Sequence, residues 1–262
     1  LYIICLRWNS VQSIYVTFQK VDFLRVVCTT QLHNGMLQII VRDFSRVEAQ
    51  QVDEADFSKS KPAEVEQLVE QLSTALRSVT CPQLSRIVES YLSDEELMGS
   101  FKQAPAGVKT HHAYEGGLLR HVVDLIQIAD AIAPRYPQLN RDLLLVGVFL
   151  HDLGKIAELN FGTEMSYTDP GQMLGHLVQG VVELQTRVDK IKAETGEAIP
   201  EEIVWRLQHM IVSHHGQRDH GSPKVPMTIE AIVLAYLDDM DAKGNAATEL
   251  IEADRNTDSQ WT

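Results

Sequence analysis

The chain of 262 residues is long enough for one large domain, or for a domain of about 200 residues with a smaller companion. With 44% hydrophobic and 23% charged residues it has the composition of an ordinary globular protein, which excludes the disordered, collagen-like and disulfide-scaffold classes. The net charge of −13 excludes a protein that coats nucleic acid with its whole surface.

Residues 1–47 predict a small β segment of short strands. Residues 23–28 and 36–41 are rich in β-branched and apolar side chains, and Asn34-Gly35 between them is a strong hairpin signal. Three strands alone leave unpaired edges, so we expect part of a small barrel or a sheet that packs on the next domain. Residues 1–60 hold six basic and six acidic residues, whereas residues 61–262 hold 17 and 30. A contact with nucleic acid should therefore involve this neutral segment, or a basic or metal-filled cleft in the acidic remainder.

The rest of the chain predicts a helical bundle. Residues 48–61 are polar and predict a linker, after which Pro62 begins an apolar stripe of helical period through Leu68 and Leu72. Further helices are expected at about 83–92, 116–133, 140–153, 170–192, 200–214 and 228–243. Residues 143–150 are apolar on every side, which predicts a central, fully buried helix. The expected fold is mainly α, with a helical domain at 62–262.

Candidate metal ligands follow from that buried helix. His151 and Asp152 end it, and two ionisable groups in such a place are costly to bury unless a metal ion or another partner satisfies them. The alternative is a helix end that reaches solvent. Further imidazole and carboxylate groups lie on or beside apolar stripes of other predicted helices: His121, His176, His214, His215 and Asp238. Asp239 and Asp241 neighbour the last of these, but we expect only one of the three to face the site directly.

The ordered pattern of these residues resembles the HD-domain metal-dependent phosphohydrolases over about residues 105–245. The resemblance implies two divalent ions that share Asp152 as a bridging ligand. It places one ion on His121, His151, Asp152 and Asp238, and the second on Asp152, His176, His214 and His215. Imidazole and carboxylate ligands without thiolates suit manganese first, with iron, cobalt or zinc as alternatives, better than magnesium or calcium.

A second resemblance concerns the segment before His121. Residues 116–121 read Gly-Gly-Leu-Leu-Arg-His, follow the pair His111-His112, and are similar to the YhaM-type 3′-5′ exoribonucleases, which join an N-terminal OB-fold to an HD domain. The resemblance implies that residues 1–47 are part of an OB-fold, incomplete because that fold takes about five strands. His111 and His112 are candidates for contacts to substrate phosphates. The two-metal arrangement of the first resemblance makes Asp152 and Lys155 the candidate catalytic residues, with Lys155 also a candidate phosphate contact. For the lysine and the two histidines, an ordinary solvated position is the alternative.

The implied function is a phosphodiesterase that releases nucleoside monophosphates from the 3′ end of single-stranded RNA or DNA, with water activated by two metal ions. One alternative is a phosphohydrolase of mononucleotides or other small phosphate esters, because ligands define the chemistry and not the substrate. Another is a nucleic-acid-binding protein with a non-catalytic metal site. A cyclic-dinucleotide phosphodiesterase is less favoured because no Gly-Tyr-Pro follows His214-His215-Gly216.

Cysteines and apolar runs bear on where the protein works. Cys5, Cys28 and Cys81 are odd in number and unclustered, which excludes a disulfide framework and favours a reducing, cytoplasmic setting. The longest strongly apolar run, residues 143–150, is far shorter than the roughly 18 residues that span a bilayer, so no membrane partner is expected. The incomplete barrel leaves a homo-oligomer as an open expectation.

Overall fold

The computed structural model describes residues 4–6, 18, 22–33, 36–52, 62–108, 114–161 and 165–254. The chain forms two compact units: Leu1–Ser58 together with Ala247–Thr262, and Lys59–Ala246. The domain boundaries expected at residues 47 and 61 remain predictions. Most of the expected linker, residues 48–61, lies outside the described residues.

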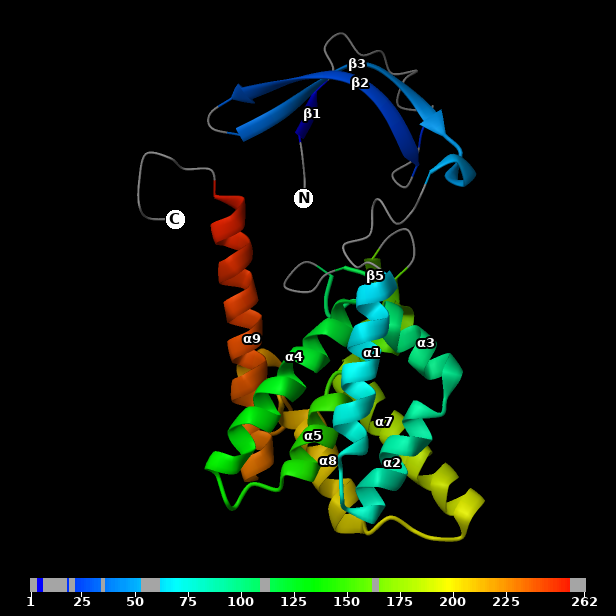
Figure 1. Ribbon diagram of the computed structural model, residues 1–262, viewed down its shortest axis with the longest axis vertical. Helices are drawn as coiled ribbons and strands as arrows, with labels where there is room; N and C mark the ends of the chain where they lie inside the picture. Colours follow the sequence, from blue (N-terminus) through cyan, green and yellow to red (C-terminus); the bar gives the residue numbers. More distant parts are fainter. Residues whose placement is uncertain are drawn as a thin grey trace. The chain divides into compact units, whose positions relative to one another are not determined.

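The N-terminal part contains a three-stranded sheet in the order β1-β3-β2, drawn in blue in Figure 1. β2 (Phe23–His33) and β3 (Met36–Val47) are antiparallel with His33 opposite Met36, so two residues connect them, as the Asn-Gly pair predicts. β1 (Ile4–Leu6) pairs parallel with β3. The described sheet therefore confirms a small β segment, although β2 and β3, with 11 and 12 residues, are longer than the short strands expected.

Much of β2 is exposed to solvent. Side chains on successive strand residues point to opposite faces, and all the side chains of residues 25–31 on β2 are exposed. Val27 pairs with Asp43 and Cys28 with Val41, so the register shifts there and the extra residue, Arg42, forms a β-bulge in β3. The sheet has the strand count of an incomplete barrel rather than of a closed one.

The larger unit is helical, as predicted. The α-helices are α1 (Pro62–Arg77), α2 (Pro82–Leu92), α3 (Glu95–Gln103), α4 (Gly117–Ile132), α5 (Arg141–Leu150), α6 (Lys155–Glu158), α7 (Asp169–Thr195), α8 (Glu201–Ser213) and α9 (Ile229–Ala253). The described residues also form short 3-10 helices, η2 (Ala49–Gln51), η4 (Ala133–Arg135) and η5 (Arg218–His220). A short antiparallel hairpin consists of β4 (Leu159–Phe161) and β5 (Met165–Tyr167). Among the helices that the structure describes, none has the length and apolar character that a bilayer crossing requires.

α5 is the central helix of this unit, and residues 143–150 are all buried, as the sequence predicts. It packs against α1, α2, α4 and α8 (Figure 1). The side chain of Asn140 caps its first turn by accepting the Leu143 N–H. Gly147 leaves room for the Met210 side chain of α8, because a Cβ there would lie only 2.0 Å from the Met210 Cε. The ends of α5 and α8 therefore lie close enough for their terminal residues to share one site.

α7 departs from the single regular helix that the sequence predicts. Gly175 has φ 72° and ψ 162°, which breaks the helix into two parts just before His176. α6 lies directly against it, since a Cβ at Gly154 would lie 2.1 Å from the His176 carbonyl oxygen, and one at Gly171 would lie 2.2 Å from the Glu158 carbonyl oxygen. Neither α6 nor the β4–β5 hairpin was expected from the sequence, and α9 extends ten residues beyond the predicted end at 243.

Candidate metal centre

The helix ends described above bring all seven predicted ligands into one cluster. α4 carries His121, the turn after α5 carries His151 and Asp152, and α9 carries Asp238. The kinked α7 carries His176, and His214 and His215 end α8. Potential ligand atoms lie within 4.8 Å of one another in three groups: His121, His151 and Asp238; His151, Asp152 and His214; and His176, His214 and His215. The first group is called the first set below, and the last group the second set.

Asp152 lies between the two sets and is 1% exposed. Its Oδ2 is 3.4 Å from His151 Nε2 and 3.7 Å from His121 Nε2. Its Oδ1 is 3.5 Å from both His176 Nε2 and His214 Nε2. Each carboxylate oxygen therefore faces a different set, which is the arrangement that a bridging carboxylate requires.

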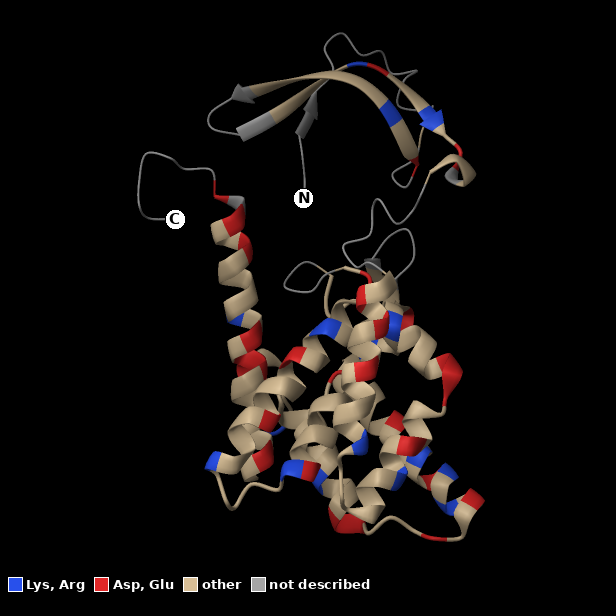
Figure 2. Ribbon diagram, viewed as in Figure 1, with Lys and Arg blue, Asp and Glu red and all other residues tan. Residues whose placement is uncertain are grey.

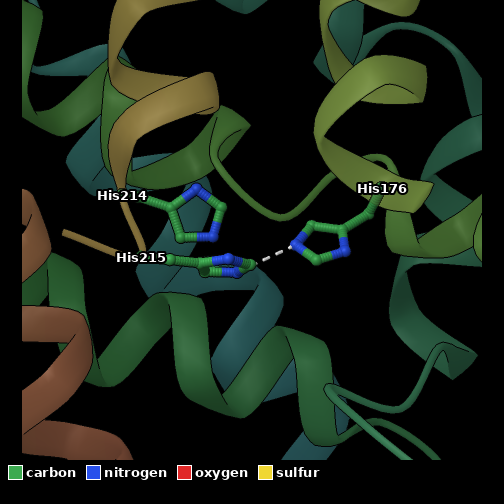
Figure 3. Close-up of side chains that lie close together, drawn as sticks. All are labelled: His176, His214 and His215. Carbon is green, nitrogen blue, oxygen red and sulfur yellow. Dashed lines mark hydrogen bonds between the residues drawn. The ribbon is translucent and has the colours of Figure 1, made fainter. Parts of the chain in front are cut away.

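Within each set, ring nitrogens face one another. In the first set His121 Nε2 is 3.3 Å from His151 Nε2 and 3.3 Å from Asp238 Oδ1. In the second set His176 Nε2 is 3.2 Å from His215 Nε2, and Figure 3 shows the rings of His214 and His215 extending from the end of α8 toward His176. Atoms bound about 2.1 Å from one ion lie roughly 3.0–3.5 Å apart in octahedral or tetrahedral coordination. These three spacings match that range, whereas His151 Nε2 and Asp238 Oδ1 in the first set are 3.9 Å apart.

The Nδ1 atoms of the histidines all point to oxygen acceptors. In three cases the acceptor is a backbone carbonyl at 2.7–3.0 Å: Val148 for His151, Ile211 for His214 and His220 for His215. In the other two it is a carboxylate, Asp241 for His121 at 2.7 Å and Glu158 for His176 at 3.0 Å. A carbonyl or an ionised carboxylate only accepts, so each Nδ1 carries a proton and each Nε2 is the potential ligand atom for a metal ion.

These contacts suit a divalent cation. Two unprotonated ring nitrogens 3.2–3.3 Å apart repel each other unless a proton or a cation lies between them. Asp152 Oδ1 is buried, and none of the residues that the structure describes donates a hydrogen bond to it, a costly state for a carboxylate oxygen. A cation between this oxygen and the second set would satisfy both, so the residues present fit a metal ion.

The electrostatics of the cluster favour the metal-binding forms of His214 and Asp152, but not that of His121. Burial lowers the pKa of His214 to about 4, so its imidazole is neutral. Burial opposes ionisation of Asp152, but the charge of Lys155, together with interactions with His151 and His214, outweighs it and holds the pKa of that carboxyl well below its usual value. Burial would also lower the pKa of His121, yet hydrogen bonds to Asp238 and Asp241 prevail and raise it to about 9. A metal ion that binds His121 Nε2 must therefore displace a proton at neutral pH.

Two of the acids in this network were missed from the sequence. Asp241 was set aside in favour of Asp238, but residues three apart share a helix face, so both reach the site and the spacing was the available signal. Figure 2 shows the acidic residues of α9, which carries six acids and one lysine. Glu158 has no such signal, because only the α6–α7 packing brings it to His176.

The substrate-binding predictions have separate outcomes. Lys155 lies in the cluster, with Nζ 2.6 Å from Asp152 Oδ2 and its side chain 15% exposed. His111 and His112 lie outside the described residues. His209 stands apart from the cluster and accepts the Met227 N–H at 2.9 Å, which is a structural role.

Comparison with known proteins identifies the family. A family model described as HD domain matches residues 118–243, which include all seven predicted ligands. The chain is 35% identical over 246 residues to the 3′-5′ exoribonuclease YhaM of Bacillus subtilis (strain 168), a match that covers 94% of this chain and 76% of that protein. It is 36% identical over 242 residues to YhaM of Geobacillus sp. (strain WCH70), with 92% and 71% covered. No solved structure matches significantly.

The resemblances seen in the sequence are thus confirmed at the level of the family. The HD domain implies dependence on divalent metal ions, and the clustered histidines and aspartates could bind them. The chain therefore belongs to the HD-domain family of YhaM-type 3′-5′ exoribonucleases and is a metal-dependent phosphohydrolase.

Proposed function

We propose that this enzyme is a 3′-5′ exoribonuclease that removes nucleoside monophosphates from single-stranded RNA, with single-stranded DNA as a second substrate. The main observation behind the proposal is the orientation of the Asp152 carboxylate, whose Oδ2 faces the first set while its Oδ1 faces the second. The names of the relatives, 3′-5′ exoribonucleases, support RNA and the 3′ end.

The proposed ligands follow the two sets. His121, His151, Asp152 and Asp238 hold one ion, and Asp152, His176, His214 and His215 hold the second. Manganese is the proposed metal, with iron, cobalt or zinc as alternatives, because the donors are imidazoles and carboxylates. When bound, two such ions activate a water molecule and neutralise the charge of the phosphoryl oxygens.

The protein side chains have distinct tasks in this proposal. Asp152, ionised and almost fully buried, sets the separation of the two sets. Lys155 keeps its ammonium group at the partly exposed edge of the cluster, where it can bind a phosphate oxygen of the substrate. His111 and His112, in the segment before α4, are proposed as further contacts to substrate phosphates.

The division of labour along the chain is also proposed. Residues 1–47 act as a partial OB-like segment, 48–61 as a linker and 62–262 as the catalytic HD domain. The exposed Arg25 and Arg42 on the sheet supply positive charge for a single strand. Cys28 and Cys81 are free thiols, which supports work in the cytoplasm.

The test uses RNA oligomers labelled at the 5′ end, incubated with the full chain and Mn²⁺. The expected result is stepwise shortening with release of nucleoside monophosphates, and protection of an oligomer whose 3′ end is blocked. Asp152→Ala and Asp238→Ala are expected to lose activity about 10³-fold or more, because each removes a proposed ligand. The matched control is Asp239→Ala, since Asp239 is exposed and pairs with Lys243 at 2.7 Å.

Two outcomes would refute the proposal. Unchanged activity in Asp152→Ala would separate the cluster from catalysis. Turnover of free nucleotides or small phosphate esters without shortening of any oligomer would assign the site to the mononucleotide alternative.

A further inference from the structure

Glu158, the last residue of α6, interacts with one histidine of the cluster in two ways. Its Oε1 accepts the backbone N–H of His176 at 3.0 Å. Its carboxylate also accepts the ring Nδ1–H of the same residue, with Oε1 at 3.1 Å and Oε2 at 3.0 Å. The residue is 8% exposed, so these bonds form in a largely desolvated place.

The fold holds Glu158 rigidly. Its backbone N–H donates to the Gly154 carbonyl at 3.0 Å, and its own carbonyl accepts the Thr168 N–H at 2.9 Å. The glycine at 171 leaves no space between α7 and the Glu158 backbone. Both ends of the β4–β5 hairpin are thereby tied to the residue, which fixes where its carboxylate lies.

The kink in α7 serves the same contact. An unbroken helix would bond the amide of His176 to the carbonyl four residues earlier. The left-handed φ of Gly175 turns that amide away, and it donates to Glu158 instead. The backbone and the ring of His176 thus both depend on one carboxylate.

We infer that Glu158 is a positioning residue for the second set: it fixes the ring orientation and the Nδ1–H form of His176, so that Nε2 faces His215 and Asp152. The inference rests on the proposed two-ion site. His214 and His215 donate to backbone carbonyls, so within the described residues His176 is the member of its set that a carboxylate holds. Asp241 has the corresponding place at His121 in the first set. Each set therefore has its own supporting carboxylate and can be weakened separately.

The experiment measures Mn²⁺ binding to the purified full chain by equilibrium dialysis and calorimetry. Glu158→Gln is nearly isosteric and is expected to lower the affinity for one of two ions about 10–100-fold, leaving the other unchanged. Glu158→Ala should lower it further, and Asp241→Asn should weaken the other ion. Glu194→Gln, an exposed glutamate 61% accessible on the same helix α7, is the matched control and should bind both ions as wild type does.

A second measurement does not depend on bound metal. Ring nitrogen chemical shifts of the metal-free protein report which nitrogen of each histidine carries the proton. We expect His176 to be protonated on Nδ1 in the wild type and to become a mixture of both forms in Glu158→Ala, while His151 and His214 stay unchanged. A purely structural role for Glu158 would change the melting temperature without moving this signal.

The outcomes separate the inference from the proposed function. If the wild type binds fewer than two ions, the two-ion function is wrong. If it binds two and both Glu158 variants bind them with unchanged affinity, only the inference is overturned. Equal weakening of both ions, or loss of cooperative unfolding even in Glu158→Gln, would also overturn it, because the carboxylate would then support the whole fold rather than one set.

Discussion

A substitution of Gly154 by alanine tests whether the close packing of α6 on α7 builds the site. A Cβ at this position would lie 2.1 Å from the His176 carbonyl oxygen and 2.8 Å from the Gly180 nitrogen, whereas ordinary contacts begin at 3.4 Å. Both neighbours are backbone atoms, so the helices must separate by about 1 Å to relieve the overlap. The backbone of Gly154 has φ −60° and ψ −19°, which alanine adopts freely, so any effect comes from the contact alone.

We expect Gly154→Ala to lower the free energy of unfolding by about 1–3 kcal/mol, as overpacking does. Because His176 moves with α7, activity should fall about 10²-fold, the usual effect of a displacement near 1 Å. Urea unfolding followed by circular dichroism measures the first quantity, and shortening of labelled RNA measures the second.

The matched control is Gly99→Ala in α3, where a Cβ would meet nothing within 4 Å. That variant should be more stable by about 0.5–1 kcal/mol, because alanine favours the helix, and fully active. If Gly154→Ala were as stable and as active as wild type, the α6–α7 contact would not position His176, and the reasoning from close packing would be refuted.

Two further predictions concern proton binding and the hydrogen bonds that Asp142 accepts. Since the pKa of His121 is raised to about 9 in the metal-free protein, a proton competes with the metal ion below that pH. The affinity for one ion should then rise about tenfold per pH unit up to about 9, and calorimetry that shows no pH dependence would contradict this. Asp142 Oδ2 accepts the N–H and the hydroxyl of Thr80, both at 2.8 Å, and its pKa is lowered because these bonds and one from Cys81 outweigh the opposing effect of burial. Asp142→Ala should therefore lower the free energy of unfolding by about 1–3 kcal/mol at neutral pH. The difference in stability between wild type and variant should shrink as the pH falls through the lowered pKa of Asp142, because the protonated wild type then loses the stabilisation that the carboxylate provides. Urea unfolding at several pH values measures it, and a difference that stays constant into acid would count against the assignment.

Local patterns predicted the features that depend on local chemistry. The run of apolar residues 143–150 identified the buried helix, because a segment without a polar face can only be interior. His151 and Asp152 at its end indicated a metal site, because buried ionisable groups require partners. The order of the other histidines then carried the family resemblance, and the structure brings all of them to one place.

Contacts between distant segments could not be predicted from the sequence. Glu158 reaches His176 only because α6 lies against α7 and Gly175 breaks the helix, and no periodic signal encodes either event. The three-residue spacing between Asp238 and Asp241 could have predicted that both face the site. Asp241 was missed because only one acid was expected to do so.

The sequence by itself determined which side chains could bind metal and in what order they occur, because residue type and the preference for burial are properties of short segments. Only the packed structure decided which oxygen of Asp152 faces which histidines, and which acceptor holds each ring. Those distances depend on how α4, α5, α7, α8 and α9 pack, and packing is set by contacts such as Gly147 with Met210 between residues far apart in the chain.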